Sequence, residues 1–101
     1  MAVCSISVVP VGTGSTSVSP YVARCHEILK GVSGVKYQLT PMATILEGDL
    51  ERLLEIALEL HRVPFGEGVK RVLTTLIIDD RTDKPLSMEG KLESVENKLK
   101  R

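Results

Sequence analysis

Apolar and polar positions recur with two different periods along the chain, and these periods predict its elements. Near the start, Cys4, Ile6 and Val8 alternate with serines, a period of two that is typical of a strand. From residue 20 to 32, apolar residues recur every three or four positions, which predicts an amphipathic helix. The same reasoning predicts strands over 2–9, 35–40, 42–47 and 69–80, and helices over 20–32, 49–62 and 88–100.

Prolines and capping residues set the predicted boundaries. Pro10 is expected to end the first strand, because proline has no N–H for a strand ladder. Ser19 before Pro20 predicts a capped start of the first helix. Asp49 and Ser87 are expected to cap the second and third helices, and residues 64–68 are expected to form a loop.

The order of these elements is βαββαβ followed by a terminal helix. That order matches the split βαβ pattern, so we expect an α+β, ferredoxin-like fold. Right-handed crossovers would place the first two helices on one face of a four-stranded antiparallel sheet. With 101 residues, the chain has the length of one domain, 1–101.

Three elements carry apolar side chains that the core of one small domain would not fully cover. The apolar arc of the second helix is wider than the stripe of about 100° that faces a core. The last strand is apolar on both faces, with Leu73 and Ile77 on the second face. The C-terminal helix has one narrow apolar seam, formed by Met88, Leu92, Val95 and Leu99. We expect either this seam or another subunit to cover the second side of the second helix.

The sheet face opposite the helices is expected to be rich in small polar side chains. Its expected members are Ser5, Ser7, Gln38 and Thr40, joined by Thr44 and Thr75. One interpretation is a second sheet packed across a dimer, and the other is a surface that lines a pocket. The two are compatible, because pockets often form where subunits meet.

Composition and charge exclude several classes of partner. The chain is 43% hydrophobic and carries 13 basic and 13 acidic residues, so no net charge favours nucleic acid or an anionic membrane. An RNA-binding sheet would also need aromatic residues on its open strands, and only three aromatics are present. Neither an export leader nor an apolar run of membrane-spanning length is found, so we expect a cytoplasmic protein with reduced thiols.

Candidate chemistry is sparse. Cys4 and Cys25 each lie in an apolar pattern and are expected in the core, and His61 is expected to be a hydrogen-bonded packing residue. His26 is expected on the exposed face of the first helix. No residues have the spacing of a metal site or of a nucleophile–base–acid set, so we predict neither metal, cofactor nor catalysis.

Two segments are candidate binding segments. The loop with Thr13, Thr16 and Ser17 precedes a helix N-terminus and could hold an anion or a polar ring, or could simply be a hydroxyl-rich turn. The hairpin that follows the second strand holds hydroxyls, a thioether and an unbalanced carboxylate. We expect Glu47, partnered by water or Arg71 when no ligand is bound, to bind a ligand together with Ser7, Thr40, Met42 and Thr44.

Several motifs together resemble the thiamine-binding protein family over nearly the whole chain. They are SISVVPVGT (5–13), TSVS with YVA (16–19 and 21–23), TPMAT with EG (40–44 and 47–48), RV with Thr74 (71–72), IDDR (78–81), and Lys91 with SVE (94–96). One departure is Ala43, where the family pattern is expected to have glycine, and the added methyl is expected to narrow the turn.

The resemblance implies a ferredoxin-like fold, homotetramers built from dimers, and non-catalytic binding of thiamine or its hydroxymethylpyrimidine precursor in the cytoplasm. Hydroxyls and a carboxylate suit the polar edge of an aminopyrimidine, and a methionine suits a thiazolium ring. An alternative is a regulatory or assembly module that senses another small metabolite, because this fold hosts many functions. An acylphosphatase-like enzyme would need an arginine in the first loop, which has none.

Overall fold

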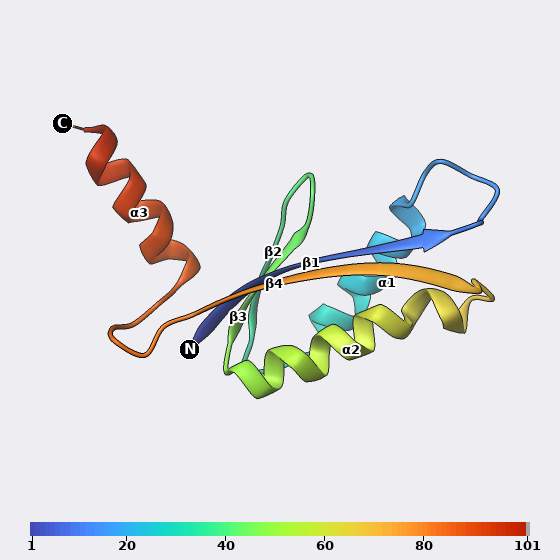
Figure 1. Ribbon diagram of the computed structural model, residues 1–101, viewed down its shortest axis with the longest axis horizontal. Coiled ribbons are helices and arrows are strands. Elements are labelled where there is room, and N and C mark those ends of the chain that lie inside the picture. The colour runs from blue at the N-terminus through green and yellow to red at the C-terminus, as the bar shows by residue number, and fades with distance from the viewer. Residues whose placement is uncertain (101) are drawn as a thin grey trace.

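The computed structural model describes residues 1–100, and its elements follow the predicted order (Figure 1). The strands are β1 (Ala2–Val11), β2 (Lys36–Leu39), β3 (Thr44–Gly48) and β4 (Arg71–Asp80). The helices are α1 (Ser19–Lys30), α2 (Leu50–Gly66) and α3 (Met88–Leu99).

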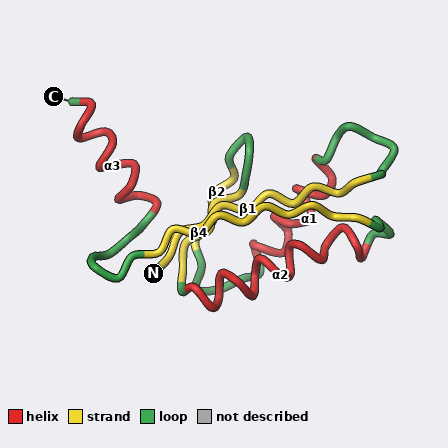
Figure 2. The backbone as a smooth tube through the Cα atoms, in the orientation of Figure 1, coloured by secondary structure: helices red, strands yellow, loops and turns green. Residues whose placement is uncertain are grey.

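The four strands form one antiparallel sheet in the order β2-β3-β1-β4. β1 pairs with β4 along its whole length, from Ala2 opposite Asp80 to Val11 opposite Arg71. It pairs with β3 only from Ala2 to Ile6. Figure 2 shows this sheet with its helices. α1 and α2 contact each other and share one core with β1, which places both on the same face, so the predicted ferredoxin-like α+β fold is confirmed.

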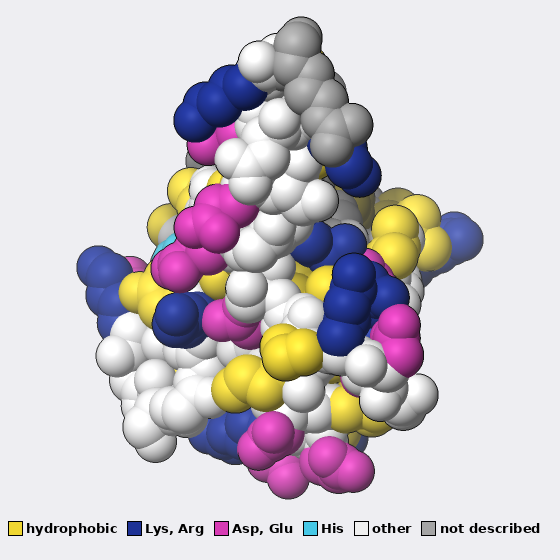
Figure 3. All heavy atoms as spheres, turned by 90° about the vertical axis from the view of Figure 1, so that its left-hand side faces the viewer, with side chains coloured by type: hydrophobic (Ala, Val, Ile, Leu, Met, Phe, Trp, Pro, Cys, Tyr) yellow, Lys and Arg dark blue, Asp and Glu magenta, His cyan; other side chains and the backbone are white. Residues whose placement is uncertain are grey.

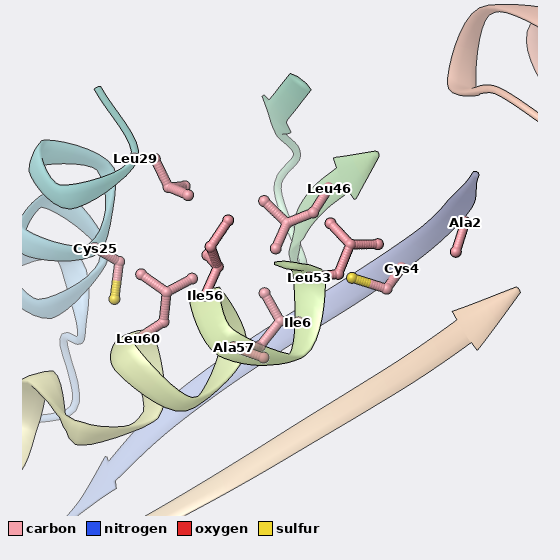
Figure 4. Packing of buried hydrophobic residues seen from close by; sticks show 10 residues of the cluster. All are labelled: Ala2, Cys4, Ile6, Cys25, Leu29, Leu46, Leu53, Ile56, Ala57 and Leu60. Atoms are coloured by element: carbon pink, nitrogen blue, oxygen red, sulfur yellow. The ribbon is translucent and has the colours of Figure 1, made fainter. Parts of the chain in front are cut away.

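The core lies between the sheet and α2, with a contribution from α1 (Figure 4). The even-numbered residues of β1 face it, as the strand period requires. Cys4 and Cys25 are both buried there, as predicted, and neither is in a disulfide. The cluster consists of Ala2, Cys4, Ile6, Cys25, Leu29, Leu46, Leu53, Ile56, Ala57 and Leu60.

Two predicted boundaries at prolines are wrong. β1 continues through Pro10, which is buried opposite Val72, to Val11. α2 continues through Pro64 to Gly66, so most of the predicted loop over 64–68 is helical. Burial explains the second case, because Pro64 is almost fully buried and its carbonyl accepts from the N–H groups of Glu67 and Val69.

The predicted caps differ in outcome. The Ser87 hydroxyl accepts from the N–H of Gly90 at 2.9 Å, so this cap is confirmed. Asp49 occupies the cap position of α2 without a side-chain hydrogen bond. Ser19 lies inside α1 rather than before it, and Val18 stands at the cap.

The predicted docking of α3 on α2 is wrong within one chain. α3 extends away from the body of the molecule (Figure 1), and three of its seam residues are largely exposed: Leu92 (57%), Val95 (57%) and Leu99 (77%). The contacts that hold α3 to the sheet are in its first turn, where Glu47 accepts from the Met88 N–H at 2.9 Å and Lys91 forms an ion pair with Asp79 at 2.5 Å. The second side of α2 consequently remains uncovered, and Leu54 and Leu58 are exposed there.

The open face of the sheet agrees with most of its predicted members. Register places Ser5, Ser7, Gln38 and Thr75 on this face. Thr44 is opposite Ile6 and faces the helices, so its predicted place is wrong. Leu73 and Ile77 share the open face and are each 63% exposed, so one chain does not bury both faces of β4.

Candidate functional site

A pocket of about 790 Å³ lies between α1, β1 and the tip of the β2–β3 hairpin. It exists because β1 continues for five residues beyond its pairing with β3, which leaves space beneath α1 at the edge of the sheet. This volume is within the usual range for small-molecule sites. Its walls are mainly apolar, from Ile6, Val8, Val9, Val18, Val22, Ala23, Cys25, Leu39, Pro41, Met42, Ala43 and Leu60; its polar residues are Ser7, Ser19, His26, Thr40 and Thr44.

One end of the pocket has a hydrogen-bonded polar pair. A ring nitrogen of His26, Nε2, lies 3.3 Å from the hydroxyl of Thr44, which is buried. The His26 ring also packs edge to face on Tyr37, with centroids 5.7 Å apart. An imidazole and a hydroxyl can each donate or accept, so this end can bind the edge of a polar ring.

The position of His26 corrects the expectation that it is exposed. His26 is partly buried, because the β2–β3 hairpin covers its side of α1. Val22, His26 and Leu29 are spaced i, i+4 and i+7, so the apolar stripe of the helix already includes this position. That spacing is the signal from which His26 could have been found as a site residue.

Thr40 shapes the hairpin tip. Its hydroxyl donates to the Ala43 carbonyl at 2.7 Å and accepts from the Ala43 N–H at 3.1 Å. The turn accommodates Ala43 without a positive φ. Met42 is 87% exposed at the tip, where its thioether borders the mouth of the pocket.

The hydroxyl-rich loop lies outside the pocket lining. Thr13 bonds the backbone of Ser15, its hydroxyl donating to the Ser15 carbonyl at 3.1 Å. The Ser17 N–H donates to the Ser15 hydroxyl at 3.1 Å, while Thr16 is exposed. These bonds describe a self-contained turn, the alternative that the sequence left open.

Glu47 lies on the opposite face of the sheet from the pocket. It is 6% exposed, and its Oε1 accepts from the backbone N–H of Met88 at 2.9 Å. Its Oε2 lies 3.9 Å from the Lys36 ammonium, which also lies 3.7 Å from Glu89. The expected partner Arg71 is replaced by Lys36 and the first N–H of α3, so Glu47 anchors α3 to the sheet.

A smaller pocket of about 400 Å³ lies beside this anchor, between β2 and α3. Residues of both elements line it, namely Val35, Lys36, Tyr37, Gln38, Met88, Glu89 and Leu92. Around this end of the molecule, acidic and basic side chains are interspersed (Figure 3). No large surface of a single charge is visible on this side.

The remaining titratable groups define what the pocket can do. Burial raises the pKa of the Cys25 thiol, which lines the pocket, so the thiol stays protonated at neutral pH. His61 is a packing residue, as predicted, with Nδ1 2.7 Å from the Thr74 hydroxyl. Within residues 1–100, no cluster of three or more His, Cys, Asp or Glu side chains could hold a metal ion. The same residues contain no helix that is long and apolar enough to cross a membrane.

Similar proteins were found by sequence over nearly the whole chain. The family model for thiamine-binding protein matches residues 4–96. The UPF0045 protein YqgV of Bacillus subtilis is 44% identical over 102 residues, which cover 98% of each chain. A UPF0045 protein of Methanothermobacter thermautotrophicus is 42% identical and covers 98% of this chain and 100% of its own.

Solved structures with the same fold were also found. The crystal structure of MJ1052 from Methanocaldococcus jannaschii is similar with a TM-score of 0.85 at 37% identity, covering 94% of this chain and 95% of its own. The Thermotoga maritima protein TM0486, whose proposed role is thiamine biosynthesis or salvage, has a TM-score of 0.75 at 26% identity and covers 93% and 97%. The extent of the family match and the identity to these relatives establish that the chain belongs to the thiamine-binding protein family.

Proposed function

We propose that this protein binds thiamine or its hydroxymethylpyrimidine precursor in the pocket beneath α1. The observation that carries the proposal is one pocket of ligand size with apolar walls and the His26–Thr44 pair at one end. A flat heterocycle with a polar edge fits a pocket with apolar walls and one polar end, because small-molecule sites usually combine apolar walls with a few well-placed polar groups. Membership of the thiamine-binding family supports the choice of heterocycle.

The lining also indicates which form of the ligand suits the pocket. None of the lining residues is a lysine or an arginine, the side chains that usually hold phosphate groups. Unphosphorylated thiamine and hydroxymethylpyrimidine are therefore the proposed ligands. The exposed thioether of Met42 at the mouth suits the polarisable thiazolium ring of thiamine.

The proposed role is binding rather than catalysis. Cys25 is the thiol that lines the pocket, and its raised pKa disfavours the thiolate that a nucleophile requires. Of the residues expected at the site, Ser7, Thr40, Met42 and Thr44 remain in the proposal, and His26 joins them. Two free, buried thiols suit the cytoplasm, where we place the protein.

Calorimetric titration tests this proposal. The parent protein is expected to bind thiamine and hydroxymethylpyrimidine, with no gain in affinity from added phosphates. Thr44→Val should weaken binding about tenfold, because it removes one hydroxyl from the polar end. Glu47→Gln should leave affinity unchanged, since Glu47 lies across the sheet. If Glu47→Gln weakens binding and Thr44→Val does not, the pocket has been misplaced; if no ligand binds, a module sensing another metabolite becomes the better account.

We also infer that the chain self-associates, with the family's homotetramer as the proposed assembly. Support comes from the exposed apolar residues on the open sheet face and on α2, such as Leu73, Ile77 and Leu58. A near-neutral chain has little charge to oppose such contacts. Sedimentation at micromolar concentration should give a species heavier than one chain. A clean 11.0 kDa monomer would refute self-association.

A further inference from the structure

Part of β1 has a free backbone edge inside the pocket. β1 pairs with β3 only as far as Ile6 opposite Thr44, although it continues to Val11 along β4. Residues 7–11 therefore lack a neighbouring strand on the β3 side. Ser7, Val8 and Val9 from this segment line the pocket, so its free edge borders the space where a ligand would lie.

The hydrogen bond at the hairpin tip shows which backbone groups face this edge. The Thr40 N–H donates to the Ala43 carbonyl at 2.9 Å, so the polar backbone groups of Ala43 point toward β2. The side to which the backbone N–H and C=O groups point alternates from residue to residue along a strand. The N–H and C=O groups of Thr44 therefore point toward β1, where Thr44 pairs with Ile6. The even-numbered residues of β1 consequently direct their N–H and C=O groups toward the β3 side.

Pro10 supports the same assignment independently. Pro10 pairs with Val72 of β4 in an uninterrupted register, and proline has no N–H. A proline is tolerated in a paired strand when its nitrogen faces the unpaired side. Pro10 therefore also directs its backbone away from β4, in agreement with the alternation from Ile6. Val8, which lies between Ile6 and Pro10, must do likewise.

Val8 thus presents both an N–H donor and a C=O acceptor at the free edge. Neither group makes a hydrogen bond that the structure shows among residues 1–100 outside the regular ladders, and β3 has already ended at this level. Val8 is half-buried. Leaving half-buried backbone groups without hydrogen bonds is unfavourable in free energy, so a ligand that bonds both the N–H and the C=O of Val8 would gain from pairing them.

We propose that the peptide edge of Val8 is the group that recognises the ligand's aminopyrimidine ring. This inference rests on the proposed function and deepens it. In an aminopyrimidine, a ring nitrogen that accepts lies next to an amino group that donates. The Val8 N–H would donate to the ring nitrogen, and the Val8 carbonyl would accept from the amino group. The ring would extend β1 sideways in the place of a β3 residue.

The recognised ligand class follows from this pairing. It comprises flat nitrogen heterocycles that carry an amino group beside an accepting ring nitrogen. The thiazole half of thiamine has no such edge, so it should bind far more weakly alone than hydroxymethylpyrimidine does. Because recognition would come from the backbone, a substitution that removes the Val8 N–H should weaken binding far more than one that only shortens the Val8 side chain.

Val8→Pro tests the proposal directly. This substitution removes the Val8 N–H, which β4 does not use, so the strand should still pair, as it does at Pro10. Affinity for hydroxymethylpyrimidine should fall tenfold or more, because one hydrogen bond is lost and its partner is left unpaired. Val8→Ala is the reference variant, since it shortens the side chain that lines the pocket but keeps the peptide. Val8→Pro should bind hydroxymethylpyrimidine at least tenfold more weakly than Val8→Ala does. Circular dichroism should confirm that both variants fold.

A ligand analogue makes the test independent of the variant's folding. The parent protein should bind 5-hydroxymethyl-2-methylpyrimidine, which lacks the amino group, at least tenfold more weakly than hydroxymethylpyrimidine. Equal affinity for the two pyrimidines, or equal affinity of folded Val8→Pro and Val8→Ala, would overturn the inference while leaving the proposed function standing. A Val8→Pro variant that changes only its sedimentation would assign this edge to a subunit interface instead. Failure of the parent to bind any pyrimidine or thiamine would overturn the proposed function itself.

Discussion

Replacing Ala23 with tryptophan is expected to weaken binding of thiamine and hydroxymethylpyrimidine by about a hundredfold. Ala23 lies on α1, where it is exposed and lines the pocket. An indole at this position would occupy the space proposed for the ligand. The ligand would lose its apolar contacts there, and a hundredfold loss corresponds to about 2.7 kcal/mol. The loss should appear in calorimetric titration.

Glu27→Trp is the matched control for this substitution. Glu27 is on the same helix and is exposed, but it does not line the pocket. Its pair with Arg24 is a surface contact of 3.9 Å, whose loss should matter little. Both variants should keep the parent's melting temperature. If the two tryptophans weaken binding equally, or neither does, the ligand lies somewhere other than beneath α1.

Ile56→Ala is expected to lower the free energy of unfolding by about 2–5 kcal/mol, the usual cost of truncating a fully buried aliphatic side chain. Ile56 is a residue of α2 and is 0% exposed, and its side chain packs in the core between the helix and the sheet (Figure 4). The loss would lower the melting temperature by several degrees for each kcal/mol. Chemical denaturation measures the effect, with all proteins at one concentration because self-association adds to stability.

Glu59→Ala provides the reference for that measurement. Glu59 is on the same helix but faces solvent, so its substitution should change stability by less than about 0.5 kcal/mol. A loss below about 1 kcal/mol for Ile56→Ala would mean that the single-chain core contributes less than its burial indicates. Stability would then depend mainly on contacts between subunits.

The fold could be predicted because its elements differ in period. The alternation in β1 and the i, i+4 spacing in α1 each bury one face, and the order of elements then leaves few topologies. Boundaries at Pro10 and Pro64 were not predictable from local rules. At Pro10 the missing N–H would have faced a free strand edge, and at Pro64 apolar burial of the ring offsets the hydrogen bond that the helix loses near its end.

The site was predictable only in part, because it depends on which face each residue takes. Thr44 and Glu47 are three positions apart in one strand, so they point to opposite faces; Thr44 lines the pocket, whereas Glu47 bonds the first N–H of α3. His26 was identifiable from its place on the apolar stripe of α1. The free edge at Val8 arises because β1 is longer than its β3 ladder, and no side-chain pattern encodes that difference.

The seam of α3 shows a further limit of sequence reasoning. Its apolar spacing predicts that something covers Leu92, Val95 and Leu99, but it does not identify the partner. Among residues 1–100, the contacts that hold α3 to the sheet lie in its N-terminal turn, through Glu47 and Asp79. A pattern in one helix specifies an interface, whereas its partner depends on surfaces elsewhere in the fold or in another subunit.

Amide chemical-shift mapping by NMR, with hydroxymethylpyrimidine titrated into the labelled protein, shows whether the ligand binds beneath α1 and bonds the Val8 peptide. We expect shifts concentrated at residues 6–9, 22–26 and 40–44, which surround the pocket beneath α1. The Val8 amide should move most, because its N–H gains a partner. Shifts centred instead on residues 36–38 and 88–92, around the smaller pocket beside Glu47, would contradict a ligand site beneath α1.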